Sequence, residues 1–226
     1  MTQIEFLETL RGILNFLELL ACIIGFLYWS KIKKSHWKWF SLYLTAIASI
    51  ELLGLFFRLK ENFSNYNIYL YQYFAMPLQF IFFCWLFYKN FFRQWQKIAA
   101  LSGIIVFLIF WLDEILSKEK SPYWFISLSY DAGVIVLLVL IMIFLIKMST
   151  TNEILNFKTN IMFWVVMGLF AGYICTIPYY IWRNYLITYE KSKPELLYVP
   201  FYVFMILNYL MYSLFCVGFI KWKPTN

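Results

Sequence analysis

Charged residues are scarce in this sequence. Asp, Glu, Lys and Arg make up 14% of the 226 residues, whereas hydrophobic residues make up 63%. A soluble domain of this length leaves too many side chains near its surface to hide so much apolar area. The composition therefore argues against a soluble protein and predicts one that lies in a lipid bilayer.

Histidine and the common catalytic motifs are also missing from the apolar runs. The single histidine, His36, lies between the first two runs, which argues against haem ligation or a histidine-rich metal site in the membrane. No HExxH, GxSxG or glycine-rich phosphate loop occurs. Lys147 and Lys221 stand only at the ends of runs, which argues against a retinal Schiff base. We predict no catalytic residue, metal or cofactor, and the balance is against an enzyme.

Cysteine is rare, and nothing in the first residues resembles a cleaved signal peptide. The four cysteines lie inside apolar runs with neither a disulfide framework nor a zinc-ligand spacing, so we predict that they are buried packing residues: Cys22, Cys84, Cys175 and Cys216. The first nine residues carry Glu5 and Glu8 in place of a basic n-region. The first apolar run is therefore expected to remain as a membrane span.

Seven apolar runs are present, each close to the 20 residues that a helix needs to cross the hydrocarbon core. They are Gly12–Trp29, Trp39–Phe57, Ile68–Tyr88, Ile98–Leu116, Tyr123–Ile146, Ile161–Trp182 and Tyr198–Ile220. Short loops join them, and many Trp and Tyr residues lie near their ends, as in interfacial belts. The sequence predicts an all-α, polytopic seven-helix transmembrane bundle that forms one domain over residues 1–226.

The loops predict the orientation of this bundle. After the first, third, fifth and seventh runs, basic residues greatly outnumber acids, and Glu153 is the only acid there. On the other side, basic and acidic residues balance, with Asp113 and Glu114 counted among the loop acids. Basic loops stay in the cytoplasm, so the N-terminus is predicted outside and the C-terminus inside. The net charge of +7 has this explanation, and nucleic acid is not predicted as a partner.

With Asp113 and Glu114 assigned to the loop, three acids remain inside the runs, Glu18, Glu51 and Asp131, at similar depth near the outer ends. A carboxylate in hydrocarbon costs a few kcal/mol, so such groups are usually protonated, paired or facing a wet cavity. Each acid lies on a polar or small-residue stripe at helical spacing. The stripes are Arg11, Asn15, Glu18, Cys22 and Gly25 in the first run, Ala48, Glu51, Gly54 and Arg58 in the second, and Ser127 with Asp131 in the fifth; Gln72 and Gln79 flank Pro77 in the third.

These stripes predict a polar cavity that opens to the outside and holds a small ligand, a lipid headgroup or a proton. The residues expected to line it are Glu18, Glu51, Asp131, Gln72, Arg58, Arg183 and Asn15. The alternative interpretation is that the polar side chains only join helices by hydrogen bonds.

The sixth and seventh runs carry packing signals. Gly168 and Gly172 form a GxxxG pattern that lets another helix approach closely. Pro178 is expected to kink the sixth run. Asn208, near the middle of the seventh run, is predicted to be a packing residue rather than a ligand contact.

Four segments carry a family resemblance. They are LELLACIIGFLYW (Leu17–Trp29), HWKWFSLYL (His36–Leu44), MPLQFIFFCWLFYK (Met76–Lys89) and NYLMYSLF (Asn208–Phe215). They resemble a group of small seven-span bacterial membrane proteins to which no activity is assigned, which implies a multi-pass protein of the bacterial inner membrane. More loosely, the topology is similar to the seven-helix sensing regions of some bacterial histidine kinases.

The first functional hypothesis is a receptor-like or sensory protein that binds its ligand on the outer side and signals through a cytoplasmic or membrane protein partner. A lipid-modifying enzyme or lipid carrier is the alternative, with the acids acting on a headgroup. A small transporter or a structural subunit of a membrane complex is also open. A transporter is disfavoured because the cytoplasmic half offers no matching polar path and no inverted repeat is visible.

Overall fold

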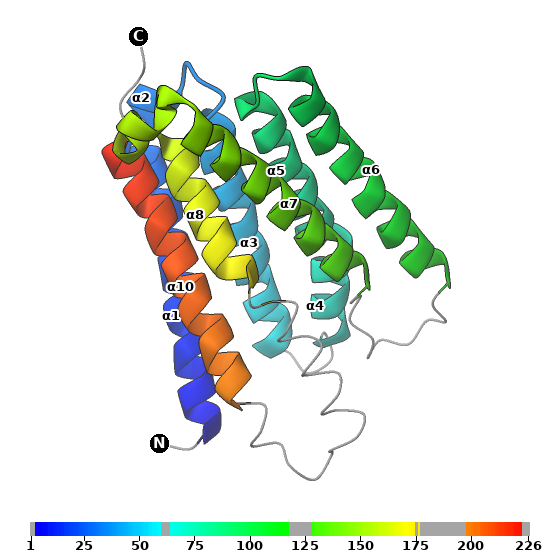
Figure 1. Ribbon diagram of the computed structural model, residues 1–226. Helices are drawn as coiled ribbons and strands as arrows, with labels where there is room; N and C mark the ends of the chain where they lie inside the picture. The colour runs from blue at the N-terminus through cyan, green and yellow to red at the C-terminus, as the bar shows by residue number, and fades with distance from the viewer. Residues whose placement is uncertain (1–2, 60–63, 118–127, 175, 177–197, 223–226) are drawn as a thin grey trace. The chain divides into compact units, whose positions relative to one another are not determined.

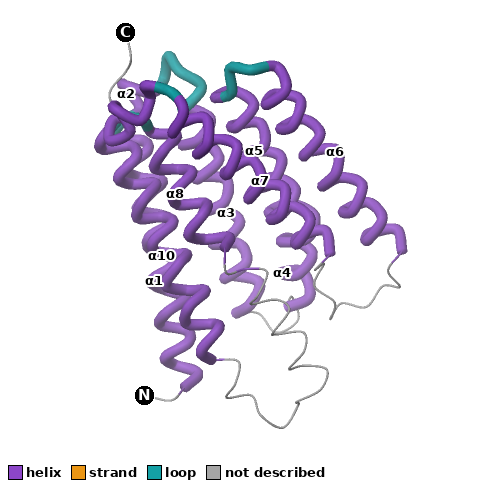
Figure 2. Tube along the Cα trace, viewed as in Figure 1, coloured by secondary structure: helices purple, strands orange, loops and turns teal. Residues whose placement is uncertain are grey.

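The computed structural model describes residues 3–59, 64–117, 128–174, 176 and 198–222. Within these residues every regular element is a helix and no strand occurs, which confirms the all-α prediction (Figure 2). In chain order the elements are α1 (Gln3–Leu27), α2 (Trp29–Ile32), α3 (Lys38–Leu59), α4 (Ser64–Leu70), η2 (Tyr71–Ala75), α5 (Met76–Asn90), α6 (Gln94–Ser117), α7 (Leu128–Thr150), η3 (Asn152–Thr159), α8 (Ile161–Ile174) and α10 (Tyr198–Lys221).

Five of the described helices are long and apolar enough to cross a membrane. These stretches are Thr9–Leu27, Lys38–Phe57, Gln94–Ser117, Leu128–Thr150 and Phe201–Lys221, and they coincide with the first, second, fourth, fifth and seventh predicted spans within a few residues. The third predicted span falls on α4, η2 and α5, which follow one another without a break. The sixth begins in α8, which is apolar but shorter; beyond Ile174, only Thr176 of that span is described, and Pro178 lies outside the described residues.

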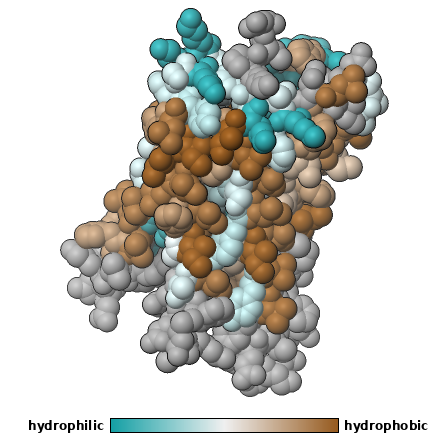
Figure 3. Space-filling model, turned by 90° about the vertical axis from the view of Figure 1, so that its left-hand side faces the viewer, coloured by the Kyte–Doolittle hydropathy of each residue, from teal (hydrophilic) through white to brown (hydrophobic). Residues whose placement is uncertain are grey.

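The described helices expose many large hydrophobic side chains. Leu116 is 82% exposed, Leu27 74% and Phe16 63%. In the face shown in Figure 3, hydrophobic residues flank a pale strip of intermediate hydropathy, and hydrophilic residues gather at the upper end. Contact of such a surface with water is unfavourable, whereas contact with lipid acyl chains is favourable.

Contacts divide the chain into two compact units, which we call unit 1 (Met1–Leu44 and Glu153–Asn226) and unit 2 (Thr45–Asn152). Helix α3 passes from the first unit to the second. A single domain over residues 1–226 stays a prediction.

In unit 1, α10 packs against both α1 and α8 (Figure 1). A Cβ atom on Gly168 of α8 would lie 2.8 Å from the Phe215 ring and 3.0 Å from the backbone oxygen of Met211. A Cβ on Gly172 would lie 2.7 Å from Met211 Sδ. The close approach predicted from the GxxxG pattern is therefore confirmed. On the other side of α10, the Tyr209 hydroxyl donates to the backbone oxygen of Leu10 in α1 over 2.6 Å.

In unit 2, α5, α6 and α7 pack against one another. A Cβ on Gly133 of α7 would lie 2.7 Å from the ring of Phe80, which is 1% exposed. At the end where α5 and α7 finish, Lys147 donates from Nζ to the backbone oxygen of Asn90 over 3.3 Å. The same ammonium lies 4.1 Å from the centre of the Phe92 ring. This end of unit 2 therefore pairs basic side chains with helix ends and aromatic rings.

Candidate functional site

Polar side chains gather at the opposite end of unit 2, beginning with Glu51 on α3. The hydroxyl of Tyr71 donates a hydrogen bond to Glu51 Oε2. Gly54, one turn further along α3, leaves room for this contact, because a Cβ there would lie 2.7 Å from Asn67 Oδ1 and 3.2 Å from the Tyr71 ring and hydroxyl. The predicted stripe on α3 thus faces α4 and η2, with Glu51 half-buried against a phenol.

The next polar contact arises from the wide π-helical turn of η2 and from Pro77. The backbone N–H of Met76 bonds to the oxygen of Tyr71, five residues back, instead of to that of Gln72. Pro77 has no N–H to offer. The carbonyl of Gln72 is therefore left without a helical donor, and the indole Nε1 of Trp111 in α6 donates to it over 3.0 Å. The Gln72 side chain is itself buried, at 6% exposure.

A second carboxyl, Glu114 of α6, holds the start of α7. Its Oε2 accepts the backbone N–H of Ser129 over 2.9 Å. In the first turn of a helix such an N–H has no partner within the helix, so Glu114 acts as a cap supplied by a neighbouring helix. The Ser129 hydroxyl donates to Met76 Sδ over 3.7 Å, at the start of α5. These contacts join α5, α6 and α7 at the level of the Trp111 contact, one turn away on α6.

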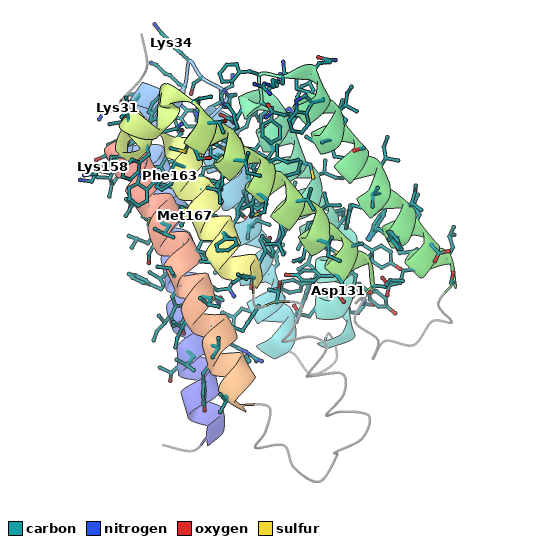
Figure 4. All side chains as sticks on the ribbon, in the orientation of Figure 1. Lys31, Lys34, Asp131, Lys158, Phe163 and Met167 are labelled. Carbon is teal, nitrogen blue, oxygen red and sulfur yellow. The ribbon has the colours of Figure 1, made fainter. Side chains whose placement is uncertain are left out.

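Asp131 lies two residues beyond Ser129, near the start of α7 (Figure 4). Its carboxyl interacts electrostatically with that of Glu114. One of its oxygens, Oδ1, is shielded from solvent and accepts no hydrogen bond from the described residues. Next to it, the Tyr130 ring packs edge-on against Phe80 at 5.4 Å. Asp131 therefore offers a hydrogen-bond acceptor beside a tightly packed aromatic layer.

Together these contacts place Glu51, Gln72 and Asp131 at one end of unit 2, where α6 contributes Trp111 and Glu114. We call the group the unit 2 polar cluster; its members are Glu51, Asn67, Tyr71, Gln72, Trp111, Glu114, Ser129 and Asp131. Arg58, predicted to line the same cavity, lies in the last turn of α3. Ser127 and Arg183 lie outside the described residues.

Glu18 belongs to unit 1, where it is 5% exposed on the buried side of α1. Ala21 is fully buried on the same side, and a Cβ on Gly25 would lie 2.7 Å from Ser41 Oγ in α3. Asn15 is half-buried. From Asn15 to Gly25, the stripe predicted for the first span is therefore half-buried or buried, whereas Arg11 at its start is exposed. A cavity shared by Glu18, Glu51 and Asp131 stays a prediction, because Glu18 lies in the other unit.

Glu114 corrects the sequence interpretation, which counted it among the loop acids. It is 8% exposed and lies within α6, whereas its neighbour Asp113 is exposed. The buried residues of α6 are Gln96, Ala100, Gly103, Phe107 and Glu114. They follow helical spacing along one face, and Glu114 continues that face by seven residues. This register was the signal in the sequence that could have placed Glu114 inside.

The described contacts of the cluster are hydrogen bonds. Among the described residues, no group of three or more His, Cys, Asp or Glu side chains could hold a metal ion. Cys84 and Cys216 are buried and Cys22 is half-buried, whereas Cys175 lies outside the described residues.

Comparison with protein-family models, curated proteins and solved structures gives no match to this chain. Its function is therefore inferred from the chemistry of the cluster and from the distribution of charge.

Proposed function

We propose that this chain is a receptor-like or sensory membrane protein of the bacterial inner membrane, with seven spans, its N-terminus outside and its C-terminus in the cytoplasm. Five apolar helices of sufficient length support a multi-pass protein. The unbroken helical stretch from Ser64 to Asn90 supports a sixth span, and the apolar helix α8 supports a seventh.

The charge distribution within unit 2 supports this orientation. Carboxyl groups gather at the end that holds the polar cluster, whereas Lys89, Lys97 and Lys147 lie at the other end. Lys89 and Lys97 both lie 5.8 Å from the centre of the Tyr88 ring, as expected for cations at an interfacial belt. Basic residues mark the cytoplasmic side, so the polar cluster belongs to the outer side.

The observation that carries the proposed function is the polar cluster itself. Three carboxyl groups, Glu51, Glu114 and Asp131, lie in helices that are apolar enough to cross a membrane. Holding carboxyl groups in such a setting costs free energy, and intramembrane acids are therefore usually functional. Asp131 supplies an acceptor oxygen that the described residues leave without a hydrogen bond. The proposed ligand is a small molecule, a lipid headgroup or a proton that reaches this cluster from outside.

Signalling would start at the π-helical turn η2. Segments of this kind are rare and occur frequently at functional sites. Tyr71 and Gln72 lie in the turn, so a ligand that competes for the Glu51 carboxyl or the Trp111 indole acts directly on the turn that precedes α5. Helix α5 ends at Asn90 on the proposed cytoplasmic side. A protein partner that binds at this end would respond to the altered position of α5.

Labelling of single cysteines tests the orientation. The background lacks the native cysteines, and an impermeant thiol reagent is added to intact cells. Positions predicted outside should react at once, and positions predicted inside only after the membrane is opened. The outside positions are Asn65, Glu119 and Lys193, and the inside positions are Lys34, Gln94 and Asn156. Reaction of the second set in intact cells would overturn the orientation.

A Glu51→Gln substitution tests the ligand site, because it keeps the shape of the side chain and removes its charge. Tm of the purified protein is measured with phosphocholine, phosphoethanolamine or glycerol 3-phosphate and across pH, so that a proton is tested as well. We expect at least one condition to shift Tm of the parent protein, and Glu51→Gln to fold but lose that shift.

Asn208→Leu is the matched control for this experiment. The Asn208 amide bonds to the Phe204 oxygen within its own helix over 2.8 Å, so its removal should leave the shift in place. An unchanged shift in a folded Glu51→Gln protein would show that Glu51 only joins helices. Absence of any shift in the parent protein would contradict a site for these headgroups or for a proton.

A further inference from the structure

The segment between α1 and α3 in unit 1 has a fixed conformation. It contains the short helix α2, whose last residue, Ile32, is fully buried, and Trp37, which is 4% exposed. Between these anchors, the Ser35 hydroxyl donates to the Ile32 oxygen over 2.9 Å and accepts the Trp37 N–H over 3.3 Å. Two buried anchors and two local hydrogen bonds therefore hold the segment in one arrangement.

This fixed segment presents a cluster of lysines, which we call the unit 1 basic cluster: Lys31, Lys33, Lys34, Lys38, Lys158 and Lys221. Lys31, Lys33 and Lys34 are exposed within the segment. Lys158 lies at the same end of unit 1 (Figure 4), and so does Lys221, because a Cβ on Gly218 of α10 would lie 3.4 Å from the Ile161 side chain at the start of α8. The residues 28–38, 152–160 and 220–223 include seven lysines and one acid, Glu153.

Exposed apolar side chains adjoin these lysines on both sides. Leu27 is 74% exposed and Phe26 43% at the end of α1, and Trp39 is 49% exposed at the start of α3. Aromatic rings also lie under the ammonium groups. Lys31 Nζ lies 4.7 Å from the centre of the Tyr28 ring, and Lys38 Nζ lies 5.5 Å from that of Trp39. The surface thus changes from apolar to cationic within a few residues.

We propose that this surface is a binding site for an anionic phospholipid. The ammonium groups of Lys31, Lys33 and Lys34 bind the phosphate of the headgroup, and the acyl chains lie against Phe26, Leu27 and Trp39. Basic clusters at the end of membrane helices attract anionic lipids by about 1 kcal/mol for each lysine, which is about fivefold in affinity. An acidic protein would match the charge alone, whereas a phospholipid matches both the charge and the adjoining apolar surface. The proposal requires only that unit 1 crosses a membrane, so it stands apart from the proposed sensory function.

Native mass spectrometry of the full chain tests this site. The protein is purified in neutral detergent and mixed with phosphatidylglycerol or phosphatidylcholine of identical acyl chains. We expect preferential retention of phosphatidylglycerol. In the triple variant Lys31→Gln, Lys33→Gln and Lys34→Gln, this preference should fall by at least about tenfold. Replacement of the same three residues by arginine should preserve it, because the charge is kept.

The matched control is the double variant Lys89→Gln and Lys97→Gln in unit 2, which removes two lysines that lie beside an aromatic ring and should keep the preference. Circular dichroism verifies that each variant is folded. Equal retention of the two lipids by the parent protein would refute the proposal, and so would an unchanged preference in the folded triple glutamine variant. Displacement of the lipid by 100-fold excess inorganic phosphate would assign the site to free phosphate and also refute it. If the triple variant lost only binding to polyglutamate, the surface would be a protein contact instead.

Discussion

Gly168→Val is expected to lower the stability of the protein by about 3 kcal/mol, because the valine side chain has no room between α8 and α10. A Cβ at this position would lie 2.8 Å from the Phe215 ring and 3.0 Å from the backbone oxygen of Met211. The Phe215 ring is 1% exposed and packs edge-on against Phe40 and Tyr212, and the oxygen belongs to the backbone of α10. The two helices would have to separate, and we expect a decrease in Tm of roughly 10 °C in detergent.

Gly12→Val is the control for this measurement. It introduces the same side chain into a helix, but no atom of the described residues lies within 4 Å of a Cβ at Gly12. Its Tm should stay close to that of the parent protein. If the two variants had the same lowered Tm, the loss of stability would come from valine in a helix and not from the contact between α8 and α10.

Glu114→Leu is expected to have the second large effect. Leucine removes the acceptor of the Ser129 N–H, and Ser129 is fully buried. A buried donor without a partner costs roughly 1–3 kcal/mol. The start of α7 should therefore loosen, with a lower Tm and faster hydrogen exchange at the Ser129 amide. Glu114→Gln retains an acceptor oxygen and should recover most of the loss.

The neighbouring residue provides a control for the removal of charge. Asp113→Leu deletes a carboxyl from the same turn of α6, but Asp113 is exposed. Its Tm should change little. A larger decrease for Asp113→Leu than for Glu114→Leu would contradict the capping role of Glu114.

The sequence predicted the apolar helices well because hydropathy depends on local composition. It also predicted which faces of α1 and α3 turn inward, since Glu18, Gly25, Ala48 and Gly54 are buried as their spacing indicates. The close contact at Gly168 and Gly172 could also be predicted from the sequence, because small residues one turn apart permit close approach of another helix.

The hydrogen-bond partners of the polar side chains could not be predicted from one sequence. The bond between Glu51 and Tyr71 joins residues 20 positions apart, and that between Ser129 and Met76 joins residues 53 apart. Such pairs depend on how the helices are placed in space. Glu114 was missed for a simpler reason, because an acid near the end of an apolar run was assigned to the loop although its register continued the buried face of α6.

The wide turn at η2 also has a consequence for insertions and deletions. A turn of this kind contains one residue more than a regular α-helical turn, so loss of one residue there would restore regular pitch while α4 and α5 kept their present faces. Phe74 is the most exposed residue of the turn, at 64%, so its deletion would remove few packing contacts. Pro77 would then stand four residues after Gln72, and the Gln72 carbonyl would still lack a helical donor. After the deletion, Pro77 alone would leave this carbonyl without a helical donor. We therefore expect the hydrogen bond from the Trp111 indole to persist when the wide turn is removed.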